Sequence, residues 1–290
     1  MRQASSSIKS TTDLSKTRVV FVSHGAPTLA IDRQHPSHQF FKQLGKQLGR
    51  PKAIVCISAH WEEQKAAVNT ALAPPQIYDF YGFPDEMYQI KWTPAGSPDI
   101  AARVAEALRA EGIECRGDPK HGLDHGTWVP LHLMYPEADI PVLQLSLIDS
   151  FEPRLHFRMG KALTALVKEE DVLVIGSGLI THNLRDWRAF KKREQWAVDF
   201  DKWVEEGVTK TGKEREDHFA TFKQHPLIHD AHPRVEHFVP LLPLVGVSGT
   251  GKAIKLHEHW DGSFSMAAYA FPFVTPEEDS ATTSAPADEL

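Results

Sequence analysis

Cysteine is scarce in this chain, whose 290 residues include only Cys56 and Cys115. Two thiols give no disulfide framework, so a reducing compartment is the expectation. Long apolar runs are missing as well, because the stretch at 238–247 contains two prolines and falls short of the roughly 20 apolar residues of a membrane span. We therefore expect a cytoplasmic protein with no membrane as partner.

Positive charge is not in excess either. Lys and Arg number 32 against 38 for Asp and Glu, which gives a net charge of -6. No dense basic tract is present that could neutralise a row of phosphates, so no nucleic acid is expected as partner. The polar N-terminal residues lack an apolar core, which argues against a secretory signal.

Motifs of two common enzyme classes are absent. Neither GxGxxG nor a complete GxxxxGK[ST] loop occurs, and Gly176-Ser177-Gly178 lacks a third glycine, so nucleotide binding is poorly supported. Ser23, Ser58 and Ser177 stand outside any GxSxG elbow, which leaves little support for a serine hydrolase.

The length and composition fit one folded domain. Hydrophobic residues make up 41% and charged residues 24%, which is ordinary for a globular protein. No Pro/Gly/Ser-rich linker interrupts the middle of the chain. We expect the domain over residues 17–275, a disordered tail over 1–16, and a disordered acidic tail over 276–290, where apolar surface is too sparse to order the chain.

Short apolar runs, mostly β-branched and bounded by Gly, Ser or Pro, indicate buried strands of a parallel sheet. Apolar residues at helical spacing lie between them. The alternation predicts an α/β protein, a single domain with a mostly parallel central sheet flanked by helices. Residues 62–97 are expected to form an irregular, aromatic-rich loop. The expected strands are 19–23, 53–58, 142–147, 172–175 and 263–271, and the expected helices are 36–48, 98–108, 154–168 and 187–211.

Four histidines stand at the expected strand ends or in a glycine-flanked turn. His24 and His60 follow the first two strands, His182 follows the strand at 172–175, and His125 precedes Gly126. Ligands of open α/β sheets bind beyond the carboxyl ends of the strands. Imidazole is the commonest nitrogen ligand for metals and the usual acid/base near neutral pH. The pattern therefore predicts a metal centre with its own proton-transfer groups at this edge.

Each histidine also has a plainer interpretation, namely a hydrogen bond to a turn carbonyl. Sixteen histidines occur in all, so chance clustering has weight. His232 and His237 flank Glu236, which puts two imidazoles and a carboxylate within six residues. Few thiols lie nearby, which favours Zn or non-haem Fe over a cysteine-type zinc site. The histidines expected to be surface or structural groups are His225, His229, His257 and His259.

Six ordered segments combine these histidines with aromatic and glycine residues. They are Ser23-His24-Gly25-Ala26-Pro27, Ser58-Ala59-His60-Trp61, Tyr78-Asp79-Phe80-Tyr81-Gly82-Phe83-Pro84, Gly122-Leu123-Asp124-His125-Gly126-Thr127-Trp128, Thr181-His182-Asn183-Leu184 and Glu236-His237-Phe238-Val239-Pro240-Leu241. This set resembles the signature segments of the DODA-type extradiol aromatic ring-opening dioxygenases, the DOPA-dioxygenase branch of the LigB-like class III extradiol superfamily. The resemblance runs from about residue 19 to residue 271.

The resemblance implies a metal held by His24, His60 and His237, with His125 and His182 as acid/base groups. One branch of the superfamily uses two histidines and a glutamate, so Glu236 is an alternative third ligand. His182 is a further candidate ligand. Fe(II) is the metal implied for activity, and Zn(II) can occupy the same site. The implied reactants are a catechol-type small molecule and O2, and no particular oligomeric state is implied.

Two other functions remain open at this point. A zinc-dependent hydrolase on the same scaffold would also use histidine ligands and an activated water. A metal-binding interaction protein without catalysis is the other alternative. His125 and His182 distinguish an enzyme from the binding module, because a pure binding module has no need for both.

Overall fold

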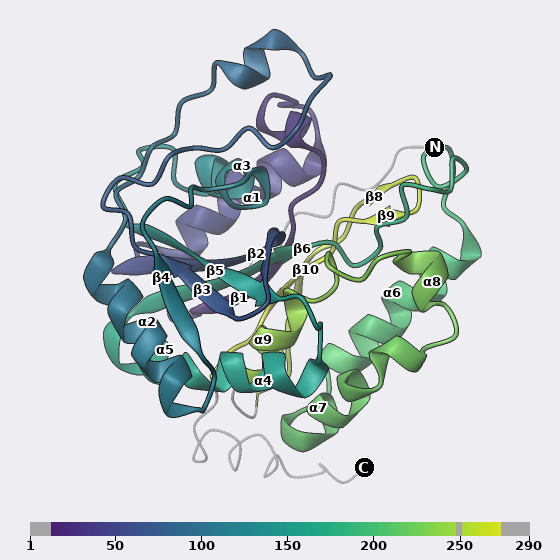
Figure 1. Ribbon diagram of the computed structural model, residues 1–290. Helices are drawn as coiled ribbons and strands as arrows, with labels where there is room; N and C mark the ends of the chain where they lie inside the picture. The colour runs from purple at the N-terminus through teal and green to yellow at the C-terminus, as the bar shows by residue number, and fades with distance from the viewer. Residues whose placement is uncertain (1–12, 248–250, 274–290) are drawn as a thin grey trace, which may run out of the picture.

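The computed structural model describes residues 13–247 and 251–273 (Figure 1). Most of the two predicted tails lies outside these residues. Leu14 belongs to the predicted N-terminal tail, yet only 1% of its surface is exposed, so the packed region already includes this residue. Across the described chain, no helix combines the length and the apolar character that a bilayer crossing requires.

One sheet organises the described residues, with eight strands in the order β4-β3-β5-β2-β6-β1-β10-β7. Its centre, β5-β2-β6-β1, is parallel, while β10 pairs antiparallel with both β1 and β7. The predicted α/β domain with a mostly parallel sheet is thus confirmed. The strands are β1 (Val19–Ser23), β2 (Ala53–Glu63), β3 (Ala66–Asn69), β4 (Cys115–Asp118), β5 (Val142–Ile148), β6 (Val172–Gly178), β7 (Ile254–His257) and β10 (Ala268–Ala270), and β8 (Trp260–Asp261) pairs separately with β9 (Phe264–Ser265).

Helices cover both faces of the sheet (Figure 1). Alternate residues of β1 point to opposite faces of the sheet. Val19 and Phe21 belong to the core under α2, α4 and α9. Val20 and Val22 belong to the core under α1 and α3. A strand buried on both faces must be apolar throughout, which explains its continuous run. The helices are α1 (Pro36–Leu48), α2 (Pro98–Ala110), α3 (His125–Met134), α4 (Pro153–Ala162), α5 (Thr164–Glu170), α6 (Gln195–Val208), α7 (Gly212–Ala220), α8 (Ile228–Ala231) and α9 (Leu241–Val247), with 3-10 turns η1 (Pro27–Ala30), η2 (Asp85–Tyr88) and η3 (Phe222–Gln224).

Several elements lie where none was expected, among them β3, η2 and α3. The segment 62–97 is not wholly irregular, since it contains β3 and η2. β3 carries a single β-branched residue, and its pairing with β4 and β5 depends on distant segments. The helix α3 begins at His125, where the sequence indicated a turn. Nine of its ten residues are buried, so it lacks the polar face that makes a helix visible in a sequence.

Other boundaries shift. The helix expected over 154–168 is divided at Leu163 into α4 and α5, and α6 starts at Gln195 rather than near 187. The late strand over 263–271 is divided into β9 and β10. Strands β2 and β6 run further than expected, to Glu63 and Gly178.

The glycines of β6 let another segment lie directly on the strand. A Cβ on Gly178 would come within 2.1 Å of the carbonyl oxygen of His237, and one on Gly176 within 2.3 Å of that of Pro240. The backbone amide of Leu179 also donates to the His237 carbonyl at 2.9 Å. Gly176 and Gly178, which resembled an incomplete nucleotide-binding motif, therefore allow the segment around His237 to pack directly on β6, and this packing fixes the position of His237.

Replacing Gly178 by Ala should therefore destabilise the fold. The added methyl would meet backbone, which cannot move aside cheaply, and we expect a loss of about 1–3 kcal/mol in the free energy of unfolding. Gly117→Ala on the edge strand β4 is the control, because its Cβ would meet a Thr70 side-chain methyl at 2.9 Å. Urea denaturation measures both, and equal stability of the Gly178 variant and wild type would contradict the packing argument.

One buried histidine outside the predicted site is structural. His156 on α4 is fully buried; its Nε2 accepts from the Ile148 amide at 3.2 Å, and its Nδ1 lies 2.9 Å from the Glu152 carbonyl. Both nitrogens are thus satisfied by the neutral ring. Burial lowers the pKa of His156 from 6.5 to about 4.

This histidine should make the protein acid-sensitive. Between pH 6.5 and about 4 the unfolded chain binds the proton and the folded chain does not, so stability falls as the pH falls through this window. Between pH 7 and pH 5, the free energy of unfolding of the wild type should fall by about 2 kcal/mol more than that of His156→Gln. The Gln amide can mimic the hydrogen bonds of the neutral ring. The exposed His229→Gln is the control in urea titrations at both pH values. Identical pH slopes for all three proteins would rule the effect out.

Candidate metal centre

A cavity of about 900 Å³ opens at the carboxyl ends of the central strands. Its floor brings together histidines that lie far apart in the sequence. Its outer walls are largely apolar and include Phe80, Phe83 and Phe264. All five histidines that the sequence singled out line it, namely His24, His60, His125, His182 and His237.

His24 is placed by the end of β1. It follows Ser23 directly, its backbone amide donates to the Gly178 carbonyl at 3.0 Å, and only 1% of it is exposed. Gly25 then adopts φ +68°, and a Cβ there would come within 2.6 Å of the Met266 side chain. Glycine is therefore required for the chain to turn away from the cavity floor.

His60 lies in an irregular part of β2. The pairing of β2 with β5 shifts register between Ile57 and Glu62, and its pairing with β6 ends at Ser58. Such irregularities re-aim side chains next to functional sites. The histidine thus points into the cavity from within a strand, rather than from the loop after it.

His182 and His237 arrive together from two loops. The His182 amide donates to the Ala231 carbonyl at 2.8 Å, and His237 is held on β6 as described above. Their rings stack with centroids 3.5 Å apart at 17°. The two side chains consequently form one side of the cavity floor.

The five rings form one continuous cluster. The centroid of His24 lies 5.1 Å from that of His60 and 5.3 Å from that of His237, and those of His60 and His237 are 4.8 Å apart. Donor atoms of His24, His60 and His125 all lie within 4.8 Å of one another, as do those of His182, Glu236 and His237. Either group brings enough ligands together for a transition metal.

Hydrogen bonds assign which ring nitrogens are free. Ser177 Oγ donates to the Gly126 carbonyl at 2.5 Å and lies 3.0 Å from His24 Nδ1, so it accepts a hydrogen from that nitrogen. Glu236 Oε1 accepts likewise from His237 Nδ1 at 3.0 Å. Both rings are therefore left with an unprotonated Nε2, the form that a metal requires.

The donor set fits a metal ion. The Nε2 atoms of His24 and His60 lie 3.2 Å apart, close enough for both to bind one ion. With metal–nitrogen bonds of about 2.0–2.1 Å, this separation corresponds to an angle of about 100° at the ion. That angle suits tetrahedral and octahedral coordination alike.

Burial keeps these imidazoles neutral. Burial, together with the charge of neighbouring imidazoles, lowers the pKa of His60 to about 3 and that of His182 to about 4. The pKa values of His24 and His237 fall well below their usual range for the same two reasons. At neutral pH the cluster is therefore ready to bind a cation without first losing protons.

The carboxylate of Glu236, the alternative ligand, contacts His237 and Arg234. Besides accepting from His237, its Oε2 lies 3.4 Å from an Arg234 nitrogen. It is not among the residues that line the cavity. Its carboxylate orients the imidazole of His237, an arrangement common behind metal-binding histidines.

The acid that precedes His125 in the sequence is not the one beside its ring. Asp124 caps α3 by accepting from the Thr127 amide at 3.0 Å, and also accepts from Ser58. Burial raises the pKa of Asp124 to about 6. The carboxylate beside His125 is Asp79, whose Oδ2 lies 2.9 Å from His125 Nδ1. Sequence reasoning gave Asp79 no role, although a lone acid between Tyr78 and Phe80 was a visible signal.

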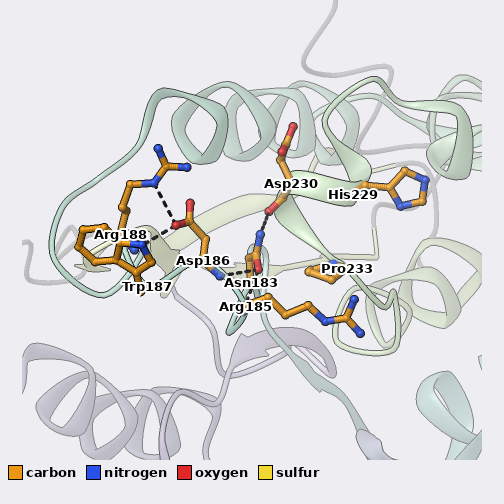
Figure 2. Close-up of a pocket in the computed structure, with 8 residues that line it drawn as sticks. All are labelled: Asn183, Arg185, Asp186, Trp187, Arg188, His229, Asp230 and Pro233. Carbon is orange, nitrogen blue, oxygen red and sulfur yellow. Dashed lines mark hydrogen bonds and ion pairs between the residues drawn. The ribbon is translucent and has the colours of Figure 1, made fainter.

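Asn183 serves the backbone rather than a bound group. Its side chain donates to the Asp230 carbonyl at 2.7 Å and accepts from the amides of Arg185 and Asp186. Figure 2 shows these bonds in a second, open pocket of about 650 Å³. The asparagine thus fixes the turn that follows His182.

The remaining histidines have varied environments. His232 is buried and lies 2.8 Å from the Ile180 carbonyl through Nε2, so it supports the loop before His182. His257 is buried against Phe40. His259 contacts Asp261, which also contacts His35, at the rim of the cavity. The amide of Ser37 donates to His35 Nδ1, which leaves the hydrogen on Nε2 facing Asp261 and makes this group a hydrogen-bonded cluster.

Comparisons with known proteins agree with this arrangement. A family profile described as the catalytic LigB subunit of aromatic ring-opening dioxygenase matches residues 18–272. The chain is 42% identical to a 4,5-DOPA dioxygenase extradiol of Beta vulgaris, over 87% of this chain and 95% of that protein. It is 37% identical to a protein of the same name from Escherichia coli, over 80% and 86%.

A solved structure shares the fold. The crystal structure of an uncharacterized protein from Escherichia coli K12 superposes with a TM-score of 0.74 at 30% identity, covering 88% of this chain and all of that one. Together with the profile match, this places the chain in the LigB family of aromatic ring-opening dioxygenases.

Proposed function

We propose that this extradiol ring-opening dioxygenase uses Fe(II) to open the ring of a DOPA-like catechol. The observation that carries the proposal is a cluster of five imidazoles, neutral or hydrogen-bonded, at the floor of an apolar-walled cavity. Several relatives are named for 4,5-DOPA, which supports a catechol with an amino-acid side chain. Zinc hydrolysis and loss of catalysis are not favoured, because the family is one of dioxygenases.

His24, His60 and His237 are the proposed metal ligands. They come from three separate segments, and hydrogen bonds leave Nε2 free on His24 and His237. His182 stacks on His237, which supports a place beside the metal rather than on it. Fe(II) held by three protein ligands would supply open positions for both reactants and a path for electrons between them.

His125 and His182 are the proposed proton-transfer groups. His125 would accept a proton from a catechol hydroxyl, which makes the ring electron-rich. His182, which burial keeps neutral by lowering its pKa, would take up a proton from the bound catechol and return it as the ring opens. The aromatic walls would hold the ring in place and exclude water.

The proposed location is the cytoplasm. Cys56 and Cys115 are both free and buried, which suits a reducing compartment.

Removing either acid/base group should separate catalysis from metal binding. We expect His125→Ala and His182→Ala to keep nearly all their metal and to lose about 10²-fold or more in turnover, the usual contribution of a positioned acid or base. Metal analysis and O2 uptake give the two readouts, with the exposed His229→Ala as control. Loss of metal would instead make the mutated residue a ligand, and unchanged turnover in both variants would reject the proton-transfer roles.

The identity of the metal should decide activity. Ring opening needs electrons to pass from the catechol to O2, and Zn(II) has no redox change to offer. Protein reconstituted anaerobically with Fe(II) should consume O2 and form a yellow semialdehyde product from DOPA or a related catechol. The zinc form should do neither. Ester or amide hydrolysis by the zinc form, without O2 uptake by the iron form, would favour the hydrolase.

A further inference from the structure

Asp79 stands between the aromatic wall of the cavity and the histidines of its floor. Its Oδ1 accepts from the backbone amide of His125 at 2.8 Å. Its Oδ2 lies 2.9 Å from Nδ1 of the same residue and 3.9 Å from His60 Nδ1. One carboxylate thus contacts both the backbone and the ring of the proposed base.

An ionised carboxylate can only accept hydrogen bonds. The hydrogen of the neutral His125 ring is therefore favoured on Nδ1, and Nε2 keeps its lone pair. Nδ1 lies within hydrogen-bond distance of Oδ2 but does not make a well-aligned hydrogen bond to it, and catalytic hydrogen bonds often become aligned only when substrate binds.

The same residue anchors the wall of the cavity. Asp79 lies between Tyr78, whose hydroxyl donates to the Ile90 carbonyl at 2.6 Å, and Phe80, whose ring faces that of His125 with centroids 6.0 Å apart. Phe80 lines the cavity together with Tyr81 and Phe83. The wall that would hold the substrate ring is thus tied to the first residue of α3.

We propose that Asp79 is a positioning residue: it holds His125 in the tautomer with hydrogen on Nδ1, so that Nε2 is the nitrogen that accepts the catechol proton. This assignment rests on the proposed dioxygenase function for its catalytic consequence, but the tautomer can be observed without turnover.

A purely structural role for Asp79 makes a different prediction. If Asp79 only holds the loop in place, Asp79→Asn should reduce kcat mildly, because the amide oxygen still accepts from the His125 backbone. Asp79→Ala should then reduce kcat severely. If Asp79 sets the tautomer, the Asn amide donates to Nδ1 and moves the ring hydrogen to Nε2, where the lone pair is lost. Asn should then reduce kcat by about 10³-fold or more, as expected for a wrong tautomer, and should be at least as damaging as Ala.

The direct test is the tautomer itself. Protein labelled with ¹⁵N-histidine and loaded with Zn(II), which is diamagnetic, is examined by long-range ¹H–¹⁵N spectra, and the His125 signals are identified by their loss in His125→Gln. Wild type and the control Asp85→Asn, an exposed acid further along the same segment, should show hydrogen on Nδ1. Asp79→Asn should show it on Nε2.

The outcomes are distinct. An unchanged tautomer in Asp79→Asn, or a kcat closer to wild type for Asn than for Ala, would overturn the positioning role. A wild-type Fe(II) enzyme that consumes no O2 with any catechol would reject the proposed function instead, and the spectra would still decide the tautomer.

Discussion

Packing several imidazoles against one another inside a protein forces them to stay neutral, since each added charge would be both desolvated and repelled by its neighbours. The groups around the cavity are arranged to suit neutral rings. A neutral ring has one hydrogen to place, and Ser177 and Glu236 each provide an acceptor for it behind His24 and His237. The cavity floor is thereby left with lone pairs, which is the chemical character that a cation requires.

Those acceptors are themselves fixed by the fold. Ser177 can accept from His24 because its own hydrogen goes to the Gly126 carbonyl, in the first turn of α3. Gly126 has no room for a side chain, since a Cβ there would lie 2.6 Å from Ser58 Oγ and 2.9 Å from the His60 ring. The ends of the strands, the start of α3 and the imidazoles that line the cavity therefore meet at one crowded point, where a small displacement would move several histidines at once.

The sequence predicted the parts of the site that follow regular strands. His24 could be placed because an apolar run ends directly before it, and parallel strands bring such ends to one edge. α3 was hidden because nearly all of it is buried, which erases helical periodicity. Asp79 was hidden because its role depends on a loop meeting a helix start, a contact between distant segments that no local pattern encodes. The roles of His237 and of the other histidines came from family resemblance rather than from spacing.

The position of β1 has a consequence for the synthesis of the chain. This strand is made first and carries the turn to His24, yet its neighbours are β6 on one side and β10 on the other, with Val20 opposite Ala270. A ribosome must therefore release almost the whole domain before β1 can fill its place in the sheet. Until then the apolar residues of β1 stay unpaired and exposed. We therefore expect the nascent chain to fold slowly and to depend on chaperones.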